Sequence, residues 1–126
     1  MKLLERILLA EDFTESSRNV VTSAIELAKI FEAKLIPIHV LPKELGDKKV
    51  ETLLKDTAML RLNETVKRIS EEGVETGDPI LEFGSAHETI VEAAIAINAN
   101  LIMVGSGENR KHERLAQKLA LVTGLF

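Results

Sequence analysis

Apolar residues along this chain follow two alternating patterns. Three short runs, at residues 3–10, 35–41 and 101–105, are almost entirely aliphatic in their middles, as is typical of strands covered on both faces of a sheet. A fourth run, 74–83, contains Gly77-Asp78-Pro79 and is expected to bend or break there. We therefore predict four strands.

Between these runs, apolar residues recur at the spacing of amphipathic helices. The first predicted helix follows Thr14 and Ser16, either of which is available as its N-cap. The second covers residues 49–72 and is ended by Gly73. Its expected apolar face is broad and consists of Val50, Leu53, Leu54, Ala58, Leu62, Val66 and Ile69.

Two further helices complete the pattern. Ser85 and Glu88 have capping-box spacing at the start of the third. In the fourth, Leu115, Leu119 and Val122 share one face. Strict alternation of strands and helices predicts parallel βαβ units with right-handed crossovers. The expected fold is an open, doubly wound parallel α/β sheet between two helix layers, in a single domain over residues 1–126.

Two features complicate this sheet. Pro37 has no backbone N–H and cannot donate a hydrogen bond to a neighbouring strand. We expect the side that lacks this N–H to face the broken run 74–83. The sequence ends at Phe126, where another strand is expected, so 101–104 would form an uncovered aliphatic edge suited to pairing with another chain. We expect the missing strand or a second domain to follow Phe126, or a partner to cover this edge.

Composition narrows the possible partners. The chain has 126 residues, 45% of them hydrophobic, and a net charge of -4, which disfavours nucleic acid and anionic membranes as main partners. It has no cysteine, so disulfides and thiolate metal sites are excluded. No apolar run reaches the roughly 18 residues that a membrane span needs, and charges interrupt any signal-like N-terminus. We expect a cytoplasmic protein.

Candidate chemistry is confined to the loops after the first and last strands, because doubly wound sheets bind ligands beyond the carboxyl ends of their strands. Asp12 closes the first strand and is either a ligand contact or a residue that begins the first helix. His39, His87 and His112 have no partners at metal-ligand spacing and are expected to be structural or exposed. No nucleophile elbow, triad or dyad is present, so neither a metal nor enzymatic activity is expected.

Four segments in this order and spacing resemble universal stress proteins. They are residues 7–16 (ILLAEDFTES), 35–40 (LIPIHV), 84–90 (GSAHETI) and 98–106 (NANLIMVGS). The resemblance implies a sheet of order 3-2-1-4-5 and a regulatory, non-catalytic role. It also implies a homodimer joined through a final strand, or pairing with a second such domain.

The resemblance further implies a crevice for an adenine nucleotide, ATP or AMP. By position, Asp12 and Val40 correspond to the residues that hold the nucleoside in ATP-binding members, and Ala10 and Gly105 line the crevice. Ser106 and Gly107 follow at the turn where the phosphates would lie.

The phosphate motif itself departs from the ATP-binding pattern, which is Gly-x-x-Gly, nine residues, then Gly-Ser or Gly-Thr. Gly105 matches, but Glu108 occupies the second glycine position and Lys118-Leu119 the Gly-Ser position. At about 4 Å and an effective dielectric near 20, a like charge there would repel a phosphate by ~4 kcal/mol, equivalent to about a thousandfold loss of affinity. We therefore predict no tight ATP binding.

Three functions stay open at this point. The first is a non-enzymatic regulatory domain that acts through dimerisation and partner contacts. The second is a nucleotide sensor, since the cations at 110–114 could hold a phosphate in a rearranged loop. The third is an ATP-activating enzyme, which rests on fold analogy alone.

Overall fold

The computed structural model describes residues 3–43 and 46–105. Strands and helices alternate along this part of the chain, as predicted. They are β1 (Arg6–Ala10), α1 (Glu15–Phe31), β2 (Lys34–Leu41), α2 (Lys48–Glu71), β3 (Ile80–Phe83), α3 (Ala86–Ala96) and β4 (Leu101–Met103). The helix predicted around 115–122 lies outside the described residues.

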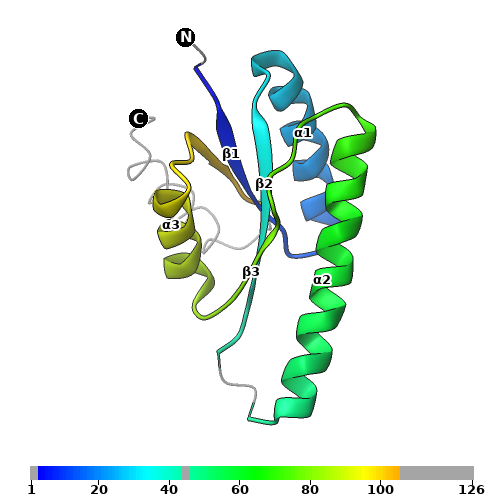
Figure 1. Cartoon of the computed structure of the whole chain (residues 1–126), viewed down its shortest axis with the longest axis vertical. Helices are drawn as coiled ribbons and strands as arrows, with labels where there is room; N and C mark the ends of the chain where they lie inside the picture. Colours follow the sequence, from blue (N-terminus) through cyan, green and yellow to red (C-terminus); the bar gives the residue numbers. More distant parts are fainter. Residues whose placement is uncertain (1–2, 44–45, 106–126) are drawn as a thin grey trace.

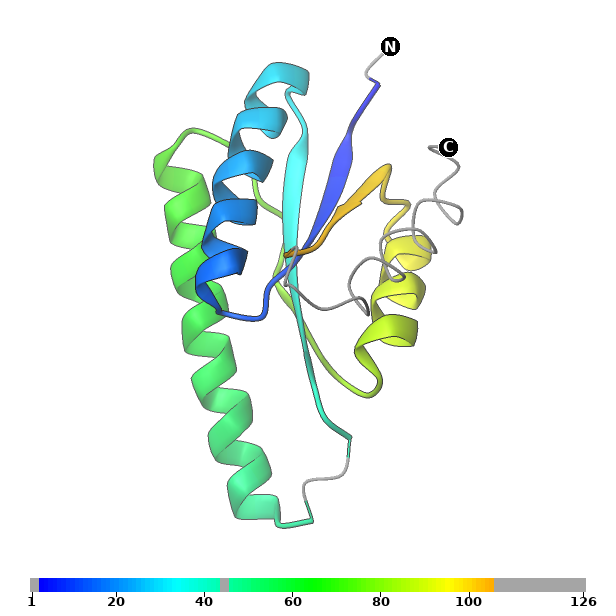
Figure 2. The ribbon, with the colours of Figure 1, turned by 180° about the vertical axis from the view of Figure 1, so that it is seen from behind.

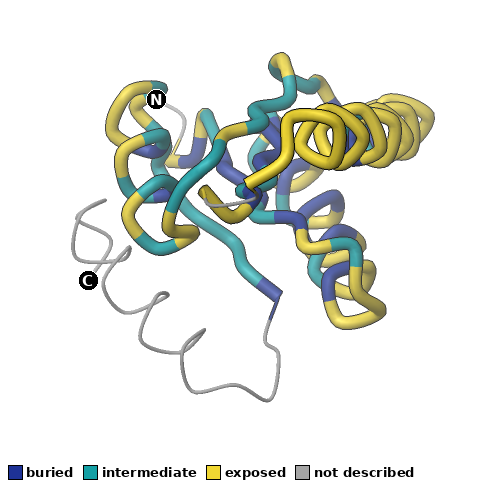
Figure 3. Tube along the Cα trace, turned by 90° about the horizontal axis from the view of Figure 1, so that it is seen from below, coloured by how far each residue is buried: buried dark blue, intermediate teal, exposed yellow. Residues whose placement is uncertain are grey.

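The strands form one parallel sheet of order β3-β2-β1-β4 (Figure 1), which confirms the predicted order for these four. Helices α1 and α2 cover one face and α3 covers the other, as the views from behind and from below also show (Figures 2 and 3). The strand order reverses at β1, which pairs with β2 on one side and β4 on the other. Ligands of doubly wound sheets bind at such a point.

The core is split in two by the alternation of side chains along β1. Ile7 and Leu9 pack toward α1 and α2, whereas Leu8, between them, packs against the α3 side. All three side chains are fully buried. Such two-sided burial explains why the predicted strands read as nearly continuous aliphatic runs rather than alternating ones.

Strands β1 and β4 are shorter than the apolar runs that predicted them. Leu3 is 72% exposed, and β1 begins only at Arg6. Just before it, the backbone N–H groups of Glu5 and Arg6 donate to Oδ1 of Asn100, at 2.7 and 2.9 Å. A side chain thus takes the place of ladder partners at this end of the sheet. At the other end, β4 stops at Met103 rather than at Gly105.

Only part of the broad apolar face predicted for α2 is buried. Ala58, Leu62 and Ile69 are buried, but Leu53 in the first half of the helix is 65% exposed, and Val50 and Leu54 are exposed as well. The 24 residues of α2 span about 36 Å, whereas the eight residues of β2 span about 26 Å. The helix therefore extends beyond the sheet that it covers (Figure 1).

Pro37 lies as expected. The N–H of Lys34 donates to Glu5 on the β1 side and the N–H of Leu35 donates to Glu75 on the β3 side. Alternation along the strand turns the missing N–H of Pro37 toward the β3 side. There the run 74–83 is interrupted: after an isolated bridge between Leu35 and Thr76, regular pairing resumes only at Ile38.

The two predicted caps differ. Thr14, not the exposed Ser16, caps α1, because its side chain accepts the N–H of Ser17 at 3.2 Å. Ser85 occupies the N-cap position of α3 but makes no side-chain capping hydrogen bond, so the predicted capping box with Glu88 is wrong. Ser85 is exposed, so water can satisfy its hydroxyl.

Candidate functional site

A small cavity of about 120 Å³ lies beyond the carboxyl ends of β1 and β4, where the strand order reverses. The structure brings four residues of the predicted crevice to its wall: Ala10, Asp12, Val40 and Gly105. Ser106 and Gly107 fall outside the described residues. That these residues bind a nucleotide stays a prediction, but their meeting at one cavity follows from the parallel sheet, which gathers its strand ends at one edge.

The loop between β1 and α1 is fixed by its own side chains. Phe13 has a left-handed backbone with φ 64°, which costs a non-glycine residue roughly 1–2 kcal/mol. The side chain of Glu11 accepts the N–H of Phe13 at 3.0 Å, and Oδ1 of Asp12 accepts the N–H and hydroxyl of Thr14 at 3.0 and 2.6 Å. These bonds hold the loop in a conformation that its sequence would otherwise disfavour.

Glu11 and Asp12 are neighbours with different environments. Glu11 is 7% exposed, and its carboxylate accepts hydrogen bonds from the hydroxyls of Ser17 in α1 and Thr65 in α2. Asp12 is exposed, and its Oδ2 accepts no hydrogen bond from the described residues. The Glu11 carboxylate therefore ties the loop to two helices, whereas the Asp12 carboxylate is available at the crevice.

His39 joins β2 to the same loop. Its Nδ1 lies 2.6 Å from the backbone carbonyl oxygen of Glu11, which can only accept, so Nδ1 is the donor. The ring centroids of His39 and Phe13 are 4.5 Å apart, and Cζ of Arg61, in α2, lies 5.6 Å from the Phe13 centroid. This histidine makes the structural contacts that its isolation in the sequence predicted.

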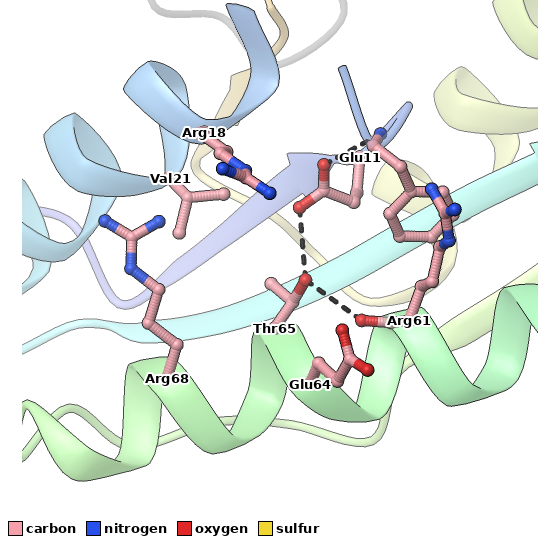
Figure 4. A pocket seen from close by; sticks show the side chains of 8 residues that line it. Glu11, Arg18, Val21, Arg61, Glu64, Thr65 and Arg68 are labelled. Carbon is pink, nitrogen blue, oxygen red and sulfur yellow. Dashed lines mark hydrogen bonds between the residues drawn. The ribbon is translucent and has the colours of Figure 1, made fainter. Parts of the chain in front are cut away.

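A second, larger cavity of about 430 Å³ lies between α1 and α2, and sequence reasoning missed it. Its lining includes three arginines, Arg18, Arg61 and Arg68 (Figure 4). A signal was present, because Arg61 and Arg68 are seven residues apart and so lie on one face of a helix. The apolar periodicity of that segment does not report these charged positions.

The described part of the chain offers neither a cluster of metal ligands nor a membrane-spanning helix. Residues 3–43 and 46–105 contain no group of three or more His, Cys, Asp or Glu side chains placed to hold a metal ion. None of the helices in these ranges is both long and apolar enough to cross a membrane.

Similarity to known proteins agrees with this architecture. The family model for the universal stress protein family matches residues 4–119. A universal stress protein from Methanocaldococcus jannaschii is 31% identical over 121 residues, which cover 90% of this chain and 71% of the relative.

Two solved structures share the fold. A universal stress family protein from Burkholderia pseudomallei is 22% identical, with a TM-score of 0.79 over 96% of this chain and 91% of the other. A universal stress protein solved in complex with cAMP is 23% identical, with a TM-score of 0.65 over 81% of this chain and 76% of the other. The match to the family model, together with the archaeal relative, establishes that this chain belongs to the universal stress protein family.

Proposed function

We propose that this chain is a non-enzymatic regulatory domain that acts through contacts with a second copy or another partner and does not hold ATP tightly. The main support is the size of the crevice. The part of the crevice that the described residues line has a volume of about 120 Å³, well below the 300–1,000 Å³ typical of small-molecule sites. The sequence of the phosphate turn agrees, because Glu108 replaces a glycine that would let the backbone approach a phosphate.

The absence of catalytic activity is supported by how the polar groups are used. In the described ranges, the hydroxyl of Ser17 donates a hydrogen bond to a carboxylate, that of Glu11. Ser17 is fully buried and lines neither the crevice nor the cavity between α1 and α2, so its hydroxyl is out of reach of a substrate. Their hydrogen bond serves to anchor the loop.

Association with a partner is supported by β4. Within the described sheet, β4 pairs with β1 alone, so its other edge is open. The N–H of Asn100 donates to Arg6 of the β1 side, and alternation turns the N–H groups of Leu101 and Met103 away from β1. Outward N–H groups on an aliphatic strand can pair with a strand from another chain.

An adenine-nucleotide sensor is the second candidate. It is favoured by the meeting of Ala10, Asp12, Val40 and Gly105 at one cavity, and by the free oxygen of Asp12. A universal stress protein of the same fold has been solved in complex with cAMP.

Calorimetric titration with ATP, AMP and cAMP distinguishes the two. We expect no binding of ATP at micromolar concentrations, and a gain of affinity in Glu108→Gly if the side-chain charge is the obstacle. Micromolar ATP binding to the unaltered chain, lost in the crevice-filling variant Ala10→Leu, would establish the sensor instead.

Sedimentation equilibrium tests the association. We expect a dimer that dissociates in Met103→Pro, which lacks the outward N–H, but not in the matched control Met103→Leu, which keeps it. A monomer at every concentration of the unaltered chain would contradict self-association through this edge.

A further inference from the structure

The cavity between α1 and α2 is lined by largely different residues from the crevice at the strand ends. Its volume of about 430 Å³ falls within the range of small-molecule sites. The two cavities share only Glu11 among their described lining residues. In Figure 4 the side chains of Arg18 from α1 and of Arg61 and Arg68 from α2 stand around this cavity, with Thr65 below the Glu11 carboxylate.

The charges around this cavity are unbalanced in favour of cations. Three arginines and two glutamates line it. The Glu11 carboxylate already accepts hydrogen bonds from Ser17, Phe13 and Thr65. The side chain of Glu64 forms no hydrogen bond or ion pair with the described residues, and none of these arginines is ion-paired within the same ranges. In a chain with 20 acidic and 16 basic residues, three arginines gathered without carboxylate partners are unexpected.

Two of the guanidinium groups are positioned by other contacts. Nη2 of Arg68 donates to Oγ1 of Thr22 at 2.5 Å, and the Thr22 hydroxyl donates to the backbone carbonyl of Arg18 at 3.1 Å. Arg61 lies over the Phe13 ring. A guanidinium carries five N–H donors, so each group keeps most of its donors for a ligand. Because these contacts already restrict the side chains of Arg61 and Arg68, less conformational entropy is lost when a ligand binds.

We propose that this cavity binds a phosphate-type oxyanion, held by Arg18 and Arg68 and bordered by Arg61. Guanidinium groups match the geometry of phosphate oxygens and bind them in pairs of parallel hydrogen bonds. A dianion suits the site better than a monoanion, since it gains attraction from three cations against the repulsion of two carboxylates. The volume leaves room for an organic group attached to the phosphate.

The test uses the full chain and three probes: inorganic phosphate, pyrophosphate and ribose 5-phosphate, each followed by amide chemical shifts in ¹H–¹⁵N NMR spectra. We expect saturable shifts that include the amides of Arg18, Thr22 and Arg68. Tighter binding of ribose 5-phosphate than of inorganic phosphate would identify a phosphate ester as the ligand class, and the reverse order would identify the free anion.

Charge-matched variants assign the binding to the cavity. Arg18→Gln and Arg68→Gln are each expected to weaken binding by at least about tenfold, the loss for one charge-assisted hydrogen bond. Arg18, Arg68 and Lys67 are all exposed, but Lys67 does not line the cavity. Lys67→Gln therefore removes the same charge from α2, next to Arg68, and should leave the affinity within about twofold. Arg18 has no side-chain partner in the described residues, so its replacement should not impair folding, which thermal melting followed by circular dichroism would verify.

Two results would overturn the proposal. One is the absence of saturable shifts with all three probes. The other is an equal loss of affinity in Arg18→Gln, Arg68→Gln and Lys67→Gln, which would mean non-specific attraction. The crevice variant Ala10→Leu should bind these anions as the unaltered chain does, because Ala10 does not line this cavity. Loss of binding in that variant would assign the anions to the crevice.

Discussion

The carboxylate of Glu11 accepts a hydrogen bond from the hydroxyl of Ser17, six residues later in the chain. The second oxygen of the same carboxylate accepts from Thr65, 54 residues away in α2. One buried acidic side chain therefore connects the end of β1 to both helices on that face of the sheet. It also forms the common wall of the two cavities.

Replacing Glu11 with alanine should destabilise the domain strongly. The variant leaves the Ser17 hydroxyl and the Phe13 N–H without their acceptor, and Ser17 is fully buried. Unsatisfied buried donors cost 1–3 kcal/mol each, so we expect a loss of about 3 kcal/mol in the free energy of unfolding. Urea unfolding followed by circular dichroism measures it. Asp12→Ala is the control, with an expected loss of about 1 kcal/mol because water can replace the exposed carboxylate; equal losses would disprove the anchoring role of Glu11.

The two N-cap residues should respond differently to alanine. Thr14 accepts the N–H of Ser17, and its loss should lower the free energy of unfolding by about 1 kcal/mol. Ser85 makes no side-chain capping hydrogen bond, so Ser85→Ala should change stability by less than about 0.5 kcal/mol. Thermal and urea unfolding of both variants give the comparison. A loss in Ser85→Ala as large as that in Thr14→Ala would mean that the capping box at α3 forms in solution.

Leucines on the two halves of α2 should also differ. Leu62 is fully buried, and Leu62→Ala should cost about 2–5 kcal/mol through lost burial and a cavity. Leu53, in the first half of α2, is 65% exposed, so Leu53→Ala should change stability by less than about 0.5 kcal/mol. Both changes replace leucine by alanine in a helix, so the difference between them reports burial. A large loss at Leu53 would show that another surface covers it in solution.

The strands and their order were predictable from the sequence because their determinants are local and repeated. Aliphatic runs such as 35–41 mark strands buried on both faces, and strict alternation with helices leaves few topologies open. The meeting of Asp12 and Gly105 at one cavity was predictable for the same reason: parallel strands end at one edge of the sheet.

Tertiary structure alone decided how far each element is covered and which side chains meet across helices. Helical periodicity shows which face of α2 is apolar but not where the sheet beneath it ends, so it could not separate the buried Leu62 from the exposed Leu53. The contact of Arg68 with Thr22 joins residues 46 positions apart and depends on how α1 and α2 pack together. The sequence by itself determined the fold and the family; the burial of Glu11 and the approach of Arg18 to the arginines of α2 follow from packing in three dimensions, which no local pattern encodes.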